Sequence, residues 1–174
     1  ITQQIGSFTS HQEALEVALQ SRAVFPDNID LMALSAQIAA SLGNIGLGLK
    51  LYGELRVLTD PAAERYRERG ERFFDKAERI GLRQVRGLVN AGDFEQAIEL
   101  CGLLTRYTAA QERVAVELIK LRSALRVRLR QLDEEEDTAG EPMRIVKLML
   151  DIVPDEASTL RRAALESMKI QDFE

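Results

Sequence analysis

Reactive side chains are scarce in this sequence. His11 and Cys101 are the only histidine and the only cysteine among 174 residues, and neither has a catalytic partner beside it in the sequence. A nucleophile needs a base within hydrogen-bonding reach, and a third group commonly orients that base. We therefore interpret His11 as a polar residue in a first helical turn and Cys101 as a small buried residue. The sequence predicts no catalytic residues and a protein that is not an enzyme.

Residue types that hold metals or phosphates are present, but their order is wrong for either ligand. No His or Cys cluster has the spacing of zinc ligands, and the acidic run 133–141 lacks the order of a calcium-binding loop. The glycine-rich run 43–48 follows a predicted helix rather than a strand, and Lys50 is followed by Leu51 instead of Ser or Thr. We expect no metal and no cofactor.

Arginine side chains are the remaining candidates for binding chemistry. Arg79, Arg83 and Arg86, together with Asn90, recur every three or four residues and would share one face of a helix. The planar guanidinium group suits a carboxylate, which it contacts through two parallel hydrogen bonds. The alternative is that these side chains only keep a helix surface solvated.

A second basic run lies next to the acidic one. Residues 113–130 contain six basic residues and only Glu117 as an acidic one, whereas residues 133–141 contain six acidic residues and no basic one. We interpret residues 133–141 as an acidic flexible loop that compensates the charge of the helix before it. In the alternative interpretation, the loop masks a basic strip that binds an anionic partner.

Composition excludes several classes of partner. The net charge of −5 and a pI near 5.1 argue against binding to nucleic acid. The longest uncharged stretch, 31–49, contains polar residues and the turn signal Gly43-Asn44, so we expect no membrane span. A single cysteine cannot form an internal disulfide, so nothing in the sequence requires an oxidising compartment. The location of the protein stays open, with the cytoplasm favoured.

Helix is the expected structure almost everywhere, because Leu, Ala, Glu and Arg dominate and no alternating run indicates a strand. Ser10 can cap the first helix, with Glu13 completing a capping box. The stretch 62–91 is either one long helix or two helices joined near Gly81. The expected helices span residues 11–25, 29–42, 45–58, 62–91, 94–107, 109–132, 142–153 and 157–170.

Two of the turns share one pattern. Gly92-Asp93-Phe94 is followed by Ala97, and Gly43-Asn44-Ile45 is followed by Gly48, Tyr52 and the closing Pro61. This pattern resembles the tetratricopeptide repeat. Ala14, Ala18 and Pro26 match the end of a preceding unit, and Gln171-Asp172-Phe173 matches the turn of a following one. Gly92 follows Gly43 by 49 positions (92 minus 43), compared with about 34 in that family, so we expect lengthened helices.

The resemblance implies an all-α fold: a right-handed superhelical array of antiparallel helix pairs, or TPR-like α-solenoid, with two lengthened helices in a single domain, 1–174. In this family the first helix of each pair lines a concave groove. The partner-binding residues implied are Asp30, Ala33, Gln37, Arg79, Arg83, Arg86 and Asn90. Because Ala33 and Gln37 replace the residues that clamp a C-terminal carboxylate in some family members, we do not expect that specific activity.

The function implied is that of a scaffold or adaptor that binds another protein or peptide, including one with acidic groups. A second hypothesis is self-assembly into a homo-oligomer through the lengthened helices 62–91 and 109–132. A third is a regulatory appendage of an enzyme whose catalytic domain lies outside this segment. Since the chain begins at Ile1, we expect a fragment of a longer protein, and its Ala, Leu and Arg content suggests a bacterial one.

Overall fold

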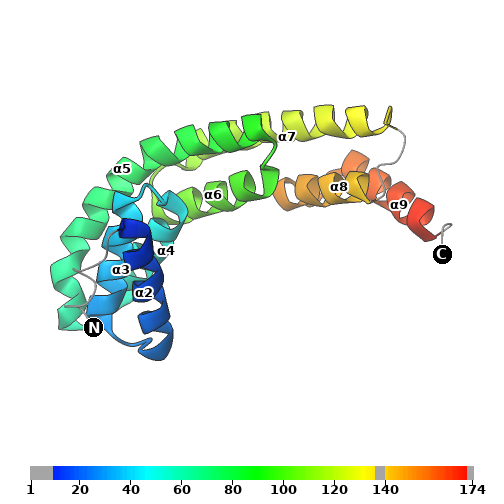
Figure 1. Cartoon of the computed structure of the whole chain (residues 1–174). Helices are drawn as coiled ribbons and strands as arrows, with labels where there is room; N and C mark the ends of the chain where they lie inside the picture. Colours follow the sequence, from blue (N-terminus) through cyan, green and yellow to red (C-terminus); the bar gives the residue numbers. More distant parts are fainter. Residues whose placement is uncertain (1–9, 136–139, 172–174) are drawn as a thin grey trace. The chain divides into compact units, whose positions relative to one another are not determined.

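The described chain consists of helices and the turns that join them. The computed structural model describes residues 10–135 and 140–171, and within these ranges it contains eight helices and no strand (Figure 1). The all-α class predicted from the sequence is confirmed. The first and last residue of each predicted helix lie within two residues of those observed. The helices are α2 (His11–Val24), α3 (Ile29–Ser41), α4 (Ile45–Val57), α5 (Pro61–Ala91), α6 (Phe94–Tyr107), α7 (Gln111–Leu132), α8 (Glu141–Ile152) and α9 (Ala157–Gln171).

The first three helices begin at side chains that accept a hydrogen bond from the helical backbone. Ser10 Oγ accepts from the Glu13 amide at 3.2 Å, which confirms the predicted cap. Asn28 and Asn44 cap α3 and α4 in the same way, at 3.0 and 3.2 Å. Each cap satisfies an amide that has no partner inside the helix, and replacing such a residue by alanine costs about 1 kcal/mol.

The turns at Gly43 and Gly92 have the same backbone geometry. Both glycines have positive φ angles, 73° and 83°, which side-chain-bearing residues rarely adopt. The amide after each glycine donates to a carbonyl five residues back, from Asn44 to Ala39 at 3.0 Å and from Asp93 to Leu88 at 2.9 Å. This is the Schellman arrangement that ends a helix and reverses the chain. The two motifs that suggested a repeat are therefore alike in structure as well as in sequence.

Helix α5 is one continuous helix of 31 residues, so the alternative of two helices joined near Gly81 is wrong. The glycines within it differ in their surroundings. A Cβ atom at Gly81 would lie 2.8 Å from a methyl carbon of Leu104, whereas a Cβ atom at Gly87 would meet nothing within 4 Å. Close packing explains the first glycine but not the second.

Contacts within the chain define two compact units. The first contains the described residues 10–81 and 103–111, and the second contains 82–102, 112–135 and 140–171. Helices α5 and α6 each contribute residues to both units.

Among the described ranges, no helix is both long enough and apolar enough to cross a membrane.

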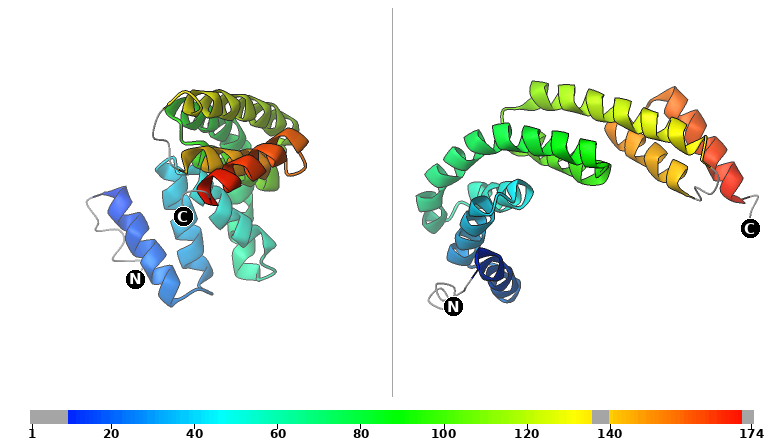
Figure 2. Two further views of the ribbon diagram at one scale, coloured as in Figure 1. Left: turned by 90° about the vertical axis from the view of Figure 1, so that its right-hand side faces the viewer. Right: turned by 45° about the horizontal axis from the view of Figure 1, so that its top comes forward.

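Helices α2, α3 and α4 lie side by side in the first unit (Figures 1 and 2). Several small residues lie on the inner face of α3, and Ser35, Ala36 and Ala39 are fully buried. Such residues allow neighbouring helices to approach closely. The buried Ser35 hydroxyl donates to the Leu31 carbonyl at 2.8 Å, so this hydroxyl has a partner inside the core.

The second unit has an apolar core and ion pairs that join its helices. Helix α8 packs against α9 (Figure 2), and Leu121, Leu125 and Val146 are fully buried. Glu156, just before α9, accepts from Arg126 at 2.5 Å and also pairs with Arg122, which ties α7 to the start of α9.

Several cations of the basic run 113–130 are paired within the chain. Lys120 contacts Glu117 at 3.1 Å, and Arg128 contacts Glu135 at 2.9 Å and Glu141 at 3.2 Å. The last two carboxylates belong to the acidic run 133–141, so these contacts favour charge compensation. Residues 136–139 of the expected flexible loop lie outside the described residues, as do Asp172 and Phe173 of the last expected turn.

Candidate functional site

An open groove lies between α3 and the first part of α5, within the first unit. Its space is about 820 Å³, including the part open to solvent. Helix α4 supplies part of its surface through Ile45 and Tyr52. The other lining residues come from α3 and α5: Gln37, Ala40, Ser41, Arg69, Arg72, Phe73, Lys76 and Ile80.

The floor of the groove is aromatic and aliphatic. The rings of Tyr52 and Phe73 are 5.2 Å apart between centroids, a distance typical of favourable aromatic pairs. The Phe73 ring occupies the space that a side chain at position 48 would fill, because a Cβ atom on Gly48 would lie 2.5 Å from Phe73 Cζ. Ile80 lies further along α5 and is 40% exposed. An apolar side chain of a ligand would find matching surface here.

The rim of the groove is basic. Arg69, Arg72 and Lys76 line it from α5, and no carboxylate is among the described lining residues. Arg69 Nη1 donates to Gln37 Oε1 at 2.7 Å, and Arg72 pairs with Glu68 at 2.5 Å, one turn earlier on the same helix. Lys76 has no ion-pair partner among the residues that the structure describes. The three cations can therefore attract an anionic ligand, and binding would disturb only the contacts of Arg69 with Gln37 and of Arg72 with Glu68.

Contacts between α3 and α5 position this rim. The Tyr66 hydroxyl donates to Asp30 Oδ1 at 2.7 Å, and Arg65 pairs with the same oxygen. The Tyr66 hydrogen bond, aided by the Arg65 charge, lowers the pKa of Asp30 below its usual value. Asp30 therefore remains ionised and holds the second turn of α5 against α3.

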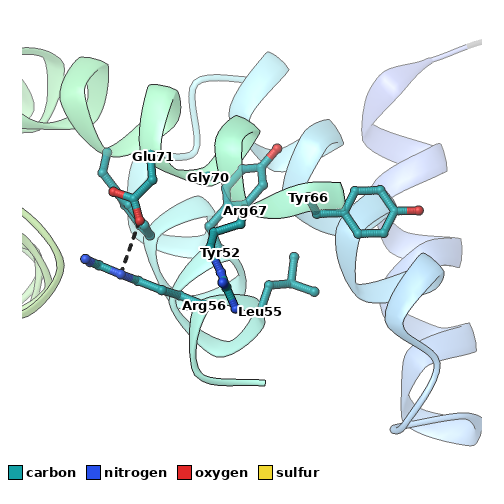
Figure 3. Close-up of a pocket in the computed structure, with 8 residues that line it drawn as sticks. Tyr52, Leu55, Arg56, Tyr66, Arg67, Gly70 and Glu71 are labelled. Atoms are coloured by element: carbon teal, nitrogen blue, oxygen red, sulfur yellow. Dashed lines mark ion pairs between the residues drawn. The ribbon is translucent and has the colours of Figure 1, made fainter. Parts of the chain in front are cut away.

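A narrower cleft lies on the other side of Tyr52, between α4 and α5. Tyr52, Leu55, Gly70 and Phe74 are among the residues that line it. Figure 3 shows the ion pair between Arg56 and Glu71 at its edge, 3.2 Å long. This cleft is too small for more than a water molecule, so we do not regard it as a ligand site.

The structure places the sequence-predicted residues of the first unit in different settings. Gln37 lines the groove, whereas Asp30 is engaged by Arg65 and Tyr66. Ala33 is only 4% exposed, because it packs in the core and not on a groove surface. Arg79 is exposed on α5 but does not line this groove.

The other three predicted residues belong to the second unit. Arg83 and Asn90 are exposed on α5. Arg86 is held by the buried Glu117, whose Oε1 accepts from Arg86 Nε at 3.0 Å and from Nη2 at 2.7 Å. The guanidinium fork expected to bind a partner's carboxylate is thus occupied by a carboxylate of the same chain. Ligand binding by Arg83 and Asn90 stays a prediction.

Sequence reasoning missed Arg69, Arg72, Lys76 and Phe73. The long helix carries cations at helical spacing in both halves, and the sequence does not say which half faces α3. One available signal was the stripe Tyr66, Gly70 and Phe73, in which Gly70 and Phe73 contact Tyr52 on α4. Of the cations beside that stripe, Arg69 and Arg72 line the α3–α5 groove, whereas Arg67 lines the cleft between α4 and α5.

Comparison with protein-family models, with curated proteins and with solved structures found no match to this chain. The resemblance to tetratricopeptide repeats therefore depends on the two Gly-Asn and Gly-Asp turns and the helices around them. Among the described residues, no group of three His, Cys, Asp or Glu side chains could hold a metal ion.

Proposed function

We propose that the protein is an interaction module that binds an acidic segment of a partner polypeptide in the groove between α3 and α5. The observation that carries this proposal is the combination of a basic rim with an aromatic floor and no lining carboxylate. Carboxylates of the partner would pair with the rim, and a large apolar side chain would contact Phe73 and Ile80.

An extended peptide fits this groove better than a small metabolite does. The groove is open rather than enclosed, whereas sites for small molecules bury most of their ligand. The net charge of −5 disfavours nucleic acid as the source of the negative charge. A polypeptide that carries both acidic and apolar side chains supplies the charge as well as the apolar contacts.

The repeated turns support the wider arrangement that we propose, a TPR-like right-handed array of antiparallel helix pairs. Each helix pair of such an array leaves one apolar face that its neighbour covers, and stacking creates an extended surface for another chain. The similar backbone geometry at Gly43 and Gly92 supports this scheme.

Selection from a displayed peptide library on the purified protein tests the function. We expect selected peptides to combine Asp or Glu with a large apolar residue, and their affinity to fall as salt increases. The double variant Arg72→Glu with Lys76→Glu should weaken binding at least about tenfold in fluorescence polarisation, since it replaces attraction by repulsion.

Lys147→Glu with Arg161→Glu is the matched control. It makes the same charge change at two exposed cations of α8 and α9, outside the groove, and should leave affinity unchanged. Peptides without acidic residues, or equal affinity for the groove variant and the control, would contradict the proposal.

A further inference from the structure

Helix α7 has an exposed apolar stripe on the face opposite its buried one. Val116, Ile119 and Val127 are 50%, 66% and 48% exposed, and Ser123 is exposed between them. Their spacing of three, four and four residues places them along one side of the helix. The buried side carries Val114, Leu121 and Leu125 instead. Exposed apolar side chains aligned on one helix face in this way form a candidate interaction surface.

Opposite charges end this stripe. Glu112 lies one turn before Val116, and Arg130 lies about one turn after Val127. Within the described ranges, neither has an ion-pair partner; Arg130 only donates to the Arg126 carbonyl at 3.4 Å. By contrast, Lys120, Arg126 and Arg128 on the same helix are paired within the chain. The unpaired charges are thus those at the two ends of the apolar stripe.

We propose that two copies of this chain associate through their α7 helices, packed antiparallel about a two-fold axis that crosses the exposed stripe at the level of residues 121 and 122. In this arrangement Val116 of each copy faces Val127 of the other, and Ile119 packs over the small Ser123 side chain. Glu112 of each copy then lies beside Arg130 of the other, so the stripe is complementary to itself. Isologous two-fold contacts require this property.

The charges select the antiparallel direction. A parallel pair would place Glu112 against Glu112 and Arg130 against Arg130, which is repulsive at both ends. Leu160, Leu165 and Met168 on α9 are also exposed, but within the described ranges no pair of unpartnered opposite charges lies at the two ends of this set. We therefore assign the contact to α7 and use α9 for the control.

The expected dimer is weak, because one helix face provides an interface at the small end of the range for specific complexes. Sedimentation velocity from about 10 µM to about 500 µM should show a rise from the 19.5 kDa of one chain towards twice that mass. Ile119→Glu should abolish this rise, since it buries a charge at the centre of the contact. Leu165→Glu, an equal change on α9, should leave it intact.

A charge exchange tests the direction of packing. Glu112→Arg alone and Arg130→Glu alone should each weaken the dimer at least about tenfold, because like charges then meet at both ends. The double variant, and an equimolar mixture of the two single variants, should each recover the original association, since every end again carries opposite charges. Circular dichroism checks that each variant is folded.

Three results would overturn the proposal. The first is a monomer throughout the concentration range, and the second is an association that Leu165→Glu abolishes and Ile119→Glu does not. The third is a failure of the mixed single variants to associate, which would exclude the antiparallel pairing. None of these results bears on the peptide groove, because its residues lie on α3, α4 and α5.

Discussion

Glu117 is a buried carboxylate that organises the residues around it in the second unit. Its Oε1 atom accepts from Arg86 and from Lys120, and the Arg86 hydrogen bonds are the main reason that its pKa is lowered. Leaving a buried charge without its partners is costly, so these cations are structural and not free for a ligand. Charge reversal at Arg86 would therefore destabilise the protein, and a loss of binding in that variant would not identify Arg86 as a ligand contact.

Cys101 should be inert in the folded protein. Its side chain is 1% exposed, and burial, with a smaller contribution from the Glu117 charge, raises the pKa of its thiol to about 11. Only the thiolate reacts with disulfide reagents, so labelling at pH 8 should be at least about a thousandfold slower than in the unfolded chain. The rate is followed by the absorbance of the thiolate that the disulfide reagent releases. Its values with and without denaturant give this ratio. Rapid labelling of the native protein would contradict the buried position.

Glu156 should make stability depend on acidity. The hydrogen bond from Thr159, together with Arg122, lowers the pKa of Glu156 from 4.5 to about 2. A carboxyl group with a lowered folded-state pKa contributes its full stabilisation above about pH 4.5 and loses it as pH falls towards 2. Glu156→Gln should cost about 1–3 kcal/mol of unfolding free energy at pH 7, and less at pH 3.

Denaturant unfolding at both pH values measures this difference. Glu134→Gln is the control, because Glu134 is exposed and has no ion-pair partner among the described residues. An equal cost for Glu156→Gln at pH 7 and pH 3 would show that the charge is not what stabilises the start of α9.

Glycine in the helices has two opposite roles. Gly53 on α4 faces the Tyr107 ring, and a Cβ atom there would lie 2.2 Å from Tyr107 Cε1. That ring stacks on Phe74 with centroids 6.3 Å apart, so it has little freedom to move away. Gly87 on α5 has open space around the position of a Cβ atom.

Alanine at these two positions should change stability in opposite directions. Gly53→Ala should lower the free energy of unfolding by about 1–3 kcal/mol, because the added methyl group overlaps the tyrosine ring. Gly87→Ala should raise it by about 0.5–1 kcal/mol, because alanine favours helix more than glycine does. Thermal unfolding followed by circular dichroism compares the two variants. Equal signs would contradict the packing described between α4 and α6.

Helix positions were predictable from the sequence because local signals define them. Ser10, Asn28 and Asn44 mark helix starts, and Gly43 and Gly92 mark the turns where positive φ angles are required. The start of α7 was predicted two residues early, because Thr108 and Ala110 still belong to the turn. Continuity through Gly81 was left open, because only the Leu104 contact explains a glycine there.

At the scale of the whole molecule, the class of fold was predictable and the site was not. Residue spacing shows which side chains share a face of a helix. Which half of α5 lies against α3 depends on contacts between distant residues, such as that of Tyr66 with Asp30. Likewise, pairing of Arg86 with Glu117 joins residues 31 positions apart, which a local pattern does not reveal. The sequence therefore indicated the chemistry of the proposed site, basic side chains on a long helix, without locating it.

The basic rim of the α3–α5 groove has a kinetic consequence. Arg69, Arg72 and Lys76 project from one helix face into solvent, and exposed charges accelerate the encounter with an oppositely charged molecule more than they prolong the complex. A partner held there would arrive quickly and also leave quickly. Fast binding and release suit a segment that is repeatedly exchanged. The lifetime of the complex would depend on how well the apolar side chain of the partner fits over Phe73.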